Sequence, residues 1–567
     1  MATQVLRRVA RSAGISEGAL RSELPERLGI PSFIQPDLVR HWERVLGRSR
    51  RLLASLAVPA GPRVGLITTV AKGYNTAGYT AILAYALRLR GADPYIVYCD
   101  AALDGCERVT VLHMPPEQFT REGPAQVCPS CYPAAERLYR TLGLPVFRLS
   151  EFLGTEAYDR AERFLGALAP ADYYQFSYRG LSLGPQVEAT VARFLFSHAP
   201  TLEPPARGIA QRCARGAVLM AEAMLAMHER LSPEVVFHNF GAYVSRGTAW
   251  LVAQAAGARS IVWSRAESDG ALMIGEGANP VIELADRTTG PWETLELTPE
   301  RSTRLDERLD VNIQGSLGRA MNRNMIDDRR RILDELRLDQ TRPVVTLFTN
   351  CGFDSKLFYD TALYPDVLAW VSDTIELFRG RREQLVIRVH PYESWIKEIE
   401  QTAGRIVARF PVLPENARLV PAEHKLNSYV LSGLSQAVIV YGSQIGVELA
   451  AAGKPVIVAG RGTYWRKGFT YDVHSREEYA AILAQLEAIA RPDAARTLMA
   501  RRFAYYYYFM RQMEFAYWNH DLRPDVRLSP WWKRFRRLED LLPGRNADLD
   551  AICAQVLDGR EALAAGV

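Results

Sequence analysis

A repeated order of strand, helix and strand constrains the fold of this chain more than any other feature. Residues 62–100 read PRVGLITTVAKGYNTAGYTAILAYALRLRGADPYIVYCD, an apolar strand, a glycine-containing turn, an amphipathic helix and a second strand. The same order returns over residues 234–263, where Gly257 is placed at the end of the helix. Because parallel strands need a crossover connection, usually a helix, this order predicts a parallel sheet covered by helices.

The second half of the chain repeats this architecture. A long polar helix is predicted over residues 318–337, and a new domain is predicted to start near residue 340, just before Pro343. Five short apolar strands follow, in the stretches VVTLFTN, QLVIRVHP, NARLVP, AVIVYGS and KPVIVAG. The predicted fold class is therefore α/β, with two doubly wound, Rossmann-like domains facing a cleft in the GT-B arrangement and helical additions at both ends.

The predicted organisation has four parts. They are an arginine-rich helical extension at 1–60, a Rossmann-like domain at 61–340, a second Rossmann-like domain at 341–488, and aromatic and basic helices at 489–567 that cross back to the first domain.

The composition is that of a globular protein. Of the 567 residues, 48% are hydrophobic and 23% are charged, and no apolar run approaches the roughly 18 residues of a membrane span. The net charge of +5 is too small to predict nucleic-acid binding, and the basic excess lies between residues 490 and 545. We therefore expect a cytoplasmic protein with no nucleic-acid partner.

The stretch YGSQIGVELAAAGKPVIVAG, at 441–460, indicates a binding turn. A strand ends in a small polar turn, and the unpaired backbone N–H groups of the following helix would attract an anion. Glu448 lies near the first turn of that helix, where it would repel a phosphate but could bind a neutral ribose diol; the alternative is that it only complements the helix dipole. The candidate donor-binding residues here are Gly442, Ser443, Gln444, Gly446 and Glu448.

Basic residues and a histidine are predicted at the same edge of the sheet. Arg461, Arg466 and Lys467 follow the next strand and could neutralise a phosphate leaving group, or could form a solvated basic loop. His390 ends a strand, and Pro391 stops that strand from continuing. The imidazole could therefore hydrogen-bond a donor phosphate, although an ordinary polar strand end is the alternative.

Several of these stretches together resemble a known family. RVHPYE, LPENARLVPAEHKLNSYVL, VIVYGSQIGVELAAAGKPVIVAGRGTYWRKGFTYD and RRFAYYYYFMRQMEFAYW resemble the capsule polysaccharide biosynthesis family of bacterial GT-B glycosyltransferases, which includes the Kdo transferases. The resemblance covers about half of the chain and is best over about residues 343–520. It implies a nucleotide-activated sugar donor in the second domain, with His390, Pro391 and Ser443 on the donor phosphate.

The broader GT-B pattern extends this implication to Glu448. The chain departs from its relatives in having Gly-Ser-Gln where Ser-Thr or Ser-Ser is common, which leaves the phosphate contacts open. Val440 stands eight residues before Glu448, so the two-glutamate spacing of many retaining enzymes is absent. The sequence therefore does not decide between inversion and retention.

Transfer with inversion needs a base for the acceptor hydroxyl. The candidates are His238, Glu267 and Asp269 in the first domain and Asp354 in the second.

Four of the seven cysteines cluster in the first domain. Six residues separate Cys99 from Cys106, and Cys128 and Cys131 form a Cys-Pro-Ser-Cys pair. The tight pair suits half of a structural zinc site, with His113 as a substitute ligand; an iron–sulfur cluster and plain thiols are the alternatives. No organic cofactor is expected.

Two aromatic stretches lie in the predicted part 489–567, and we expect them to have different roles. SPWWKRFRR, at 529–537, suits a lipid headgroup interface, or its tryptophans pack inside the protein while its arginines remain in water. FAYYYYFMRQMEFAYW is predicted to pack in a core.

The leading functional prediction is a glycosyltransferase that moves a sugar from a CMP-, UDP- or GDP-sugar to a glycan or lipid-linked glycan of the bacterial surface. It would work in the cytoplasm or at the inner face of the cell membrane. The alternatives are a polyol-phosphate transferase with a cytidine donor, a sugar-nucleotide epimerase, and a non-catalytic glycan-binding assembly protein.

Overall fold

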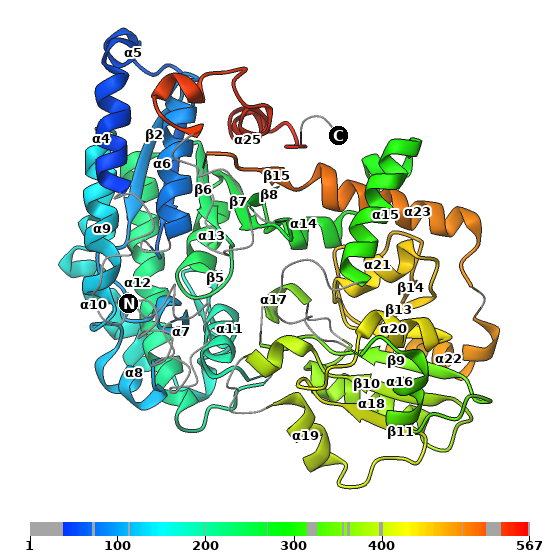
Figure 1. Cartoon of the computed structure of the whole chain (residues 1–567). Helices are drawn as coiled ribbons and strands as arrows, with labels where there is room; N and C mark the ends of the chain where they lie inside the picture. The colour runs from blue at the N-terminus through cyan, green and yellow to red at the C-terminus, as the bar shows by residue number, and fades with distance from the viewer. Residues whose placement is uncertain are drawn as a thin grey trace, which may run out of the picture. The chain divides into compact units, whose positions relative to one another are not determined.

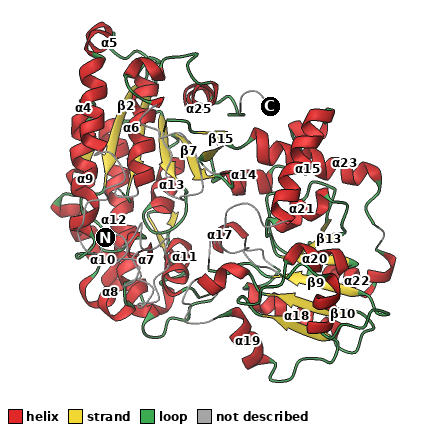
Figure 2. Ribbon diagram, viewed as in Figure 1, coloured by secondary structure: helices red, strands yellow, loops and turns green. Residues whose placement is uncertain are grey.

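Two units make up the computed structural model (Figures 1 and 2). It describes residues 38–70, 74–111, 114–197, 199–268, 270–313, 326–353, 356–359, 363–395, 401–489, 491–517 and 534–564. The first unit takes residues up to 190, 202–279 and 511 onward, and the second takes 191–201 and 280–510. The predicted boundary near residue 340 is therefore wrong, because residues 280–340 belong to the second unit.

The first unit contains a seven-stranded sheet in the order β15-β8-β7-β6-β1-β2-β3. The strands are β1 (Arg63–Thr68), β2 (Asp93–Tyr98), β3 (Val146–Arg148), β6 (Val235–Asn239), β7 (Arg259–Arg265), β8 (Ala271–Glu276) and β15 (Met513–Glu514). The pairs from β3 to β7 are parallel, whereas β8 and β15 are antiparallel to their neighbours. The register pairs Ile67 with His238, so β1 and β6 end side by side.

Helices surround this sheet (Figure 2). They are α4 (Leu38–Arg48), α5 (Arg50–Ser55), α6 (Tyr74–Arg88), α7 (Arg108–Val111), α8 (Pro116–Glu122), α9 (Cys128–Thr141), α10 (Thr155–Ala167), α12 (Ala206–Leu231), α13 (Arg246–Ala255) and α25 (Ala547–Asp558). The division between the units falls within α11 (Gly184–Leu195). Gly257 follows α13 with a φ of 73°, a left-handed conformation that glycine adopts without strain, as the sequence predicts for this helix end.

Both ends of the described chain contribute to the first core. In α4, Trp42 is fully buried, and its ring centre lies 4.9 Å from that of Phe535. The predicted N-terminal extension, of which residues 1–37 lie outside the described part, is therefore built into the core where it is described. From residue 511 onward the chain belongs to the first unit, and Met513 pairs with Leu272 of β8.

The second unit contains a six-stranded sheet in the order β11-β10-β9-β12-β13-β14. Its strands are β9 (Val344–Phe348), β10 (Gln384–Arg388), β11 (Ala417–Val420), β12 (Ala437–Val440), β13 (Val456–Val458) and β14 (Tyr471–Asp472), and all pairs are parallel. The five predicted strands are confirmed, and β14 is added to them. The predicted α/β class with two parallel sheets is also confirmed.

The helices of the second unit include one short helix, α16 (Arg329–Glu335), within the range of the predicted long one. They are α14 (Pro280–Asp286), α15 (Pro299–Ile313), α16 (Arg329–Glu335), α17 (Lys356–Tyr359), α18 (Val367–Phe378), α19 (Thr402–Arg409), α20 (Ser428–Leu434), α21 (Ile445–Ala451), α22 (Arg476–Ala484) and α23 (Ala494–Tyr505), followed by a π-helical turn at Tyr506–Met510. The prediction of one helix over 318–337 is wrong where the chain is described, because Ile326 forms a β-bridge with Leu426 and α16 begins only after its cap, Asp328.

The strand order places a site in each unit. In both sheets the first strand, β1 or β9, lies in the middle, and the connections go first to one side of it and then to the other. Ligands of such sheets bind outside the carboxyl ends of the strands at this reversal point. The positions of interest are therefore the ends of β1 and β6 in the first unit and of β9 and β12 in the second. No described helix has both the length and the apolar character that a membrane crossing requires.

Candidate donor-binding site

The predicted polar turn lies at the reversal point of the second sheet. After β12, Gly446 N–H donates to Ser443 O at 3.0 Å, and the Tyr464 hydroxyl donates to the same carbonyl at 2.7 Å. A Cβ atom at Gly446 would overlap the Tyr464 hydroxyl, and one at Gly460 would overlap the Tyr441 carbonyl. These glycines are required by close packing, and the packing fixes the backbone of the turn.

Glu448 is held by two tyrosines from distant parts of the second unit. Its side chain is 8% exposed, one oxygen accepts from the Tyr429 hydroxyl, and the other accepts from the Tyr508 hydroxyl at 3.0 Å. Tyr429 lies in α20, and Tyr508 lies in the π-helical turn. An ionised carboxylate has about four lone-pair sites, so it can accept more than two hydrogen bonds. The tyrosines thus orient the carboxylate.

Two arginines of α15 pack against the aromatic rings of the π-helical turn. The Arg308 guanidinium of α15 is 4.6 Å from the ring centre of Tyr508, and Arg304 lies 4.4 Å from that of Phe509. Cations over aromatic faces at this distance are attracted by the ring quadrupole. These contacts hold the π-helical turn, and with it the Tyr508 hydroxyl, in place against α15.

His390 follows β10, as predicted, and its ring orientation is defined. The Tyr392 backbone N–H donates to Nδ1 at 3.2 Å, and Cys351 Sγ lies 3.4 Å from the same nitrogen. Because Nδ1 accepts, the proton of the neutral ring is on Nε2. His390 therefore presents an N–H donor at Nε2. Pro391 begins the 3₁₀ turn Pro391–Trp395, which ends the strand as the sequence predicts.

A further polar atom lies at the end of β9. Asn350 is 8% exposed, and its side-chain carbonyl oxygen has no hydrogen-bond partner among the described residues. Buried polar atoms are nearly always hydrogen-bonded, so an unpartnered one at a reversal point fits a site that a ligand completes. Asn350 thus adds an acceptor to the site.

The three basic residues after β13 are not a free cationic loop. Lys467 is 6% exposed, and its ammonium donates to the carbonyls of Leu284 at 2.7 Å and Trp465 at 3.0 Å. Burial lowers the pKa of Lys467 to about 8. Arg461 forms an ion pair with Asp286, the last residue of α14. Lys467 and Arg461 therefore both connect the loop after β13 to α14.

Arg466 and Gln444, two further predicted donor-binding residues, both hydrogen-bond within the second unit. Arg466 has a φ of 60°, and its backbone N–H donates to Asp472 at 2.9 Å. Gln444 is the residue before α21, and its side-chain amide donates to the Tyr507 hydroxyl at 2.5 Å. The turn therefore contacts the π-helical turn through Gln444 as well as through Glu448.

The predicted bases have different environments. His238, in the first unit, is 2% exposed; its Nε2 lies 2.6 Å from Ser260 Oγ, and burial lowers its pKa to about 3. An imidazole with so low a pKa is a poor general base near neutral pH. Glu267 lies partly exposed in the loop between β7 and β8, whereas Asp269 and Asp354 lie outside the described residues. The identity of a base stays a prediction.

The cysteine cluster contains free thiols. Cys99, Cys106 and Cys131 are buried and Cys128 is partly exposed. Burial raises the pKa of Cys99 to about 12 and that of Cys128 to about 11, with nearby cysteines adding to both effects. Among the described residues, no three His, Cys, Asp or Glu side chains are grouped so as to hold a metal ion. His113 lies outside that part of the chain, and zinc stays a prediction.

The aromatic stretches are described in part. Tyr505, Tyr506, Tyr507 and Tyr508 are buried, which confirms the predicted core packing for this run. Phe535 is fully buried and Arg534 pairs with Glu514, whereas the tryptophans at 531 and 532 lie outside the described residues.

Sequence reasoning missed the tyrosines that hold Glu448. Tyr429 and Tyr508 are 19 and 60 residues away in the chain. Tyr508 was assigned to the core as one of four consecutive tyrosines, and nothing local distinguishes the one whose hydroxyl reaches the site. Asn350, in contrast, has a signal in the sequence, because it is the polar residue at the end of the predicted strand VVTLFTN.

Comparison with known proteins finds a family match over most of the second unit. Residues 307–508 match the family described as capsule polysaccharide biosynthesis protein. No curated protein matches the chain. Solved structures similar to it include two from Thermosulfurimonas dismutans. The KpsC beta Kdo 2,4 transferase has 15% identity and a TM-score of 0.30 over 50% of this chain and 81% of that one, and the KpsC beta Kdo 2,7 transferase has 12% and 0.28 over 57% and 88%.

A third similar structure is the UDP-GlcNAc 2-epimerase of Neisseria meningitidis bound to UDP-GlcNAc, with 10% identity and a TM-score of 0.23 over 78% of this chain and 97% of that one. The structural scores are low, so the family match has the greater weight. The matched segment contains Arg308, Asn350, His390, the polar turn with Glu448, and Tyr508. The second unit thus carries, over its candidate site, the sequence pattern of the capsule polysaccharide biosynthesis protein family.

Proposed function

We propose that this protein is a glycosyltransferase of capsule polysaccharide assembly that binds a nucleotide-activated sugar in its second unit. The observation that carries the proposal is the position of Glu448. A buried carboxylate, oriented by two tyrosines, follows the polar turn at the reversal point of a parallel sheet, within the segment that matches the capsule family.

The roles follow from the chemistry of each group. Glu448 accepts hydrogen bonds from the two hydroxyls of the donor ribose, which a phosphate could not supply. The Ser443 turn and the Nε2 proton of His390 bind the donor phosphate, because both offer hydrogen-bond donors to negative oxygens. Lys467 instead anchors α14 through two carbonyls, so it is not one of the proposed phosphate ligands.

The acceptor in this proposal is a growing surface glycan or a lipid-linked glycan. The residues of the second-unit site do not identify the base for the acceptor hydroxyl. Of the predicted bases that the structure describes, Glu267 is the one that is partly exposed. The reaction forms a glycosidic bond from the acceptor oxygen to the donor sugar and releases the nucleotide, and the acceptor proton passes to the base.

The test is thermal unfolding of the purified protein with CMP, CDP, UDP and GDP, compared with Glu448→Gln. Glutamine keeps the size of the side chain but loses the charge and half of its acceptor oxygens. A ligand at 100 times its dissociation constant adds about 2.7 kcal/mol to stability, which is a measurable shift in this size of unit. The exposed Glu415 provides the matched control, Glu415→Gln.

We expect one nucleotide to raise the unfolding temperature of the wild type and of Glu415→Gln, and to have little effect on Glu448→Gln. If no nucleotide binds, the donor site is refuted. If a nucleotide binds and a sugar nucleotide is altered without any acceptor, the chain is an epimerase instead. Phosphorus in the polymeric product would identify polyol-phosphate transfer.

A further inference from the structure

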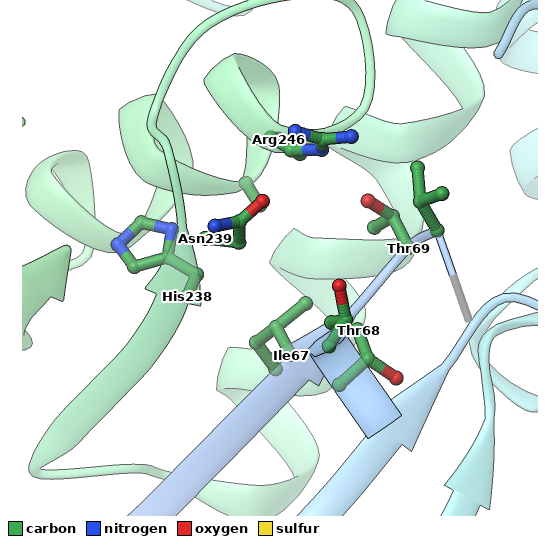
Figure 3. A pocket seen from close by; sticks show the side chains of 9 residues that line it. Ile67, Thr68, Thr69, His238, Asn239 and Arg246 are labelled. Carbon is green, nitrogen blue, oxygen red and sulfur yellow. The ribbon is translucent and has the colours of Figure 1, made fainter. Parts of the chain in front are cut away.

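The reversal point of the first sheet also has a pocket. It lies where β1 and β6 end side by side, and it is bounded by the starts of α6 and α13 (Figure 3). The depression spans about 250 Å³ when the open solvent at its mouth is counted, and about 10 Å³ of it is accessible to the centre of a water-sized sphere. The location is the one where sheets of this topology bind ligands, although none of the proposed donor residues lies there.

The pocket wall is polar at its rim and uncharged except at one position. Thr69, Thr76 and Asn239 contribute two hydroxyls and an amide, and Arg246 is the one charged residue among the described lining residues. Figure 3 shows the Arg246 guanidinium, the Asn239 amide and the Thr69 hydroxyl on different sides of the same depression. Arg246 therefore supplies the one positive charge that an anion could meet in this wall.

Arg246 is held by its backbone, not by its side chain. Glu107, which is buried, accepts from the Ser245 backbone N–H at 2.8 Å and from its hydroxyl at 2.6 Å, and the Arg246 backbone N–H lies 3.4 Å from the same carboxylate. Glu107 thus occupies the start of α13. No ion pair or hydrogen bond joins the Arg246 guanidinium to another described residue.

A buried nitrogen in the wall has no partner either. His238 is 2% exposed and lines the pocket; Nε2 is bonded to Ser260, but Nδ1 has no hydrogen-bond partner among the described residues. Leaving a buried ring nitrogen unpaired is unfavourable by about 1–3 kcal/mol. A polar ligand group in the pocket would remove this cost, which is an observation independent of the charge on Arg246.

We propose that this pocket is a second substrate site, in which Arg246 binds the carboxylate or phosphate of an anionic sugar and Asn239 and His238 bind its neighbouring polar atoms. The planar guanidinium suits both anions, because its N–H groups form paired hydrogen bonds to two oxygens. In this proposal the anionic group enters the mouth of the pocket, and the sugar that bears it lies outside. Naming that sugar as the glycan acceptor rests on the proposed function, whereas the anion site does not.

The experiment uses the full chain and three probes, glucuronate, glucose 6-phosphate and glucose, at constant ionic strength. Binding is measured by ligand-observed NMR titration for the wild type, Arg246→Gln, Asn239→Asp and the control Arg545→Gln. Arg545 is exposed, lies in the first unit and is not a lining residue. The two anionic probes distinguish a carboxylate site from a phosphate site.

We expect at least one anionic probe to bind the wild type and Arg545→Gln with similar affinity. The same probe should bind Arg246→Gln at least tenfold more weakly, and glucose should not bind. Asn239→Asp puts a negative charge at the rim and is expected to weaken the binding of the same probe. This second variant tests the proposal even if the other one fails to fold. Equal affinity in all four proteins, or no binding of either anion to the wild type, overturns it.

The nucleotide titration described above separates this proposal from the proposed function. Arg246→Gln should bind the nucleotide as the wild type does, because Glu448 and its tyrosines belong to the second unit. If Arg246-dependent anion binding occurs but no nucleotide binds, the donor site fails and the anion site stands.

Discussion

The buried carboxyl of Glu393 should make the stability of the second unit fall as pH rises, and replacing it with glutamine should remove this contribution. Glu393 lies in the turn after His390 and is fully buried, and it accepts from the backbone N–H of Thr402 at 3.0 Å and from its hydroxyl at 2.8 Å. Burial raises its pKa from 4.5 to about 7, and the charge of Glu423 adds to the shift.

The sign follows from proton linkage. Below pH 4.5 the carboxyl is protonated in both the folded and the unfolded chain, so it has no pH-dependent effect. Between pH 4.5 and 7 the unfolded chain releases its proton while the folded chain keeps it, so the free energy of unfolding falls by about 1.4 kcal/mol per pH unit. Above pH 7 the loss levels off, at an order of about 3 kcal/mol.

Glu393→Gln removes the titrating group and keeps the shape. The amide oxygen can accept from the Thr402 N–H, and the amide N–H can donate to its hydroxyl. Allowing about 1 kcal/mol for the exchange of hydrogen bonds, the variant should be more stable than the wild type by roughly 2 kcal/mol at pH 8. At pH 5 the advantage should vanish. In a unit of this size that is a rise of roughly 4–8 °C in unfolding temperature at pH 8.

The assay is calorimetry of the full chain between pH 5 and 8, with Glu415→Gln as a matched control on an exposed carboxyl. The control should follow the wild-type curve. If Glu393→Gln lowers the unfolding temperature as much at pH 8 as at pH 5, the carboxylate is stabilising when charged and the reasoning is refuted.

Three further predictions concern the site and its supports. Tyr508→Phe should reduce nucleotide affinity about fivefold to tenfold with a stability loss of about 1 kcal/mol, because it removes one donor to Glu448, as titration calorimetry would show. Gly446→Ala should destabilise by about 1–3 kcal/mol through overlap with the Tyr464 hydroxyl, in urea unfolding. Cys128, with its pKa raised to about 11, should react slowly with a disulfide reagent at pH 7.5 and about tenfold faster per pH unit above it.

Each of these predictions has a control. Tyr505→Phe alters a tyrosine of the same run and should leave nucleotide affinity unchanged; an equal loss would mean that packing, not the hydroxyl, matters. Gly433 lies in α20 with open space around its Cα, so Gly433→Ala should be neutral or stabilising. Rapid labelling of Cys128 at pH 7.5 would contradict the raised pKa of its thiol.

Local sequence predicts most of the second sheet and the positions of its polar ends. Strands β9 to β13 are runs of β-branched and apolar residues between turn signals, so His390 and Ser443 could be placed at strand ends. What could not be predicted depends on distant contacts. Lys467 reads as a solvated cation, but Leu284 supplies its partner from 183 residues earlier. The domain boundary failed for the same reason, because α15 belongs to the second unit through α23, a contact that no local pattern encodes.

The path of the chain between the two units has a consequence for its synthesis. The second unit is almost continuous in sequence, whereas the first lacks β15 and α25 until residues 511–558 have left the ribosome. Arg511, which is fully buried and bonded to the carbonyl of Ile274, enters the first core only at that stage. The first unit therefore begins first during translation but is completed after the second. A nascent chain whose residues up to 510 have left the ribosome should already hold the contacts of Glu448 with its two tyrosines, while its first sheet still lacks β15.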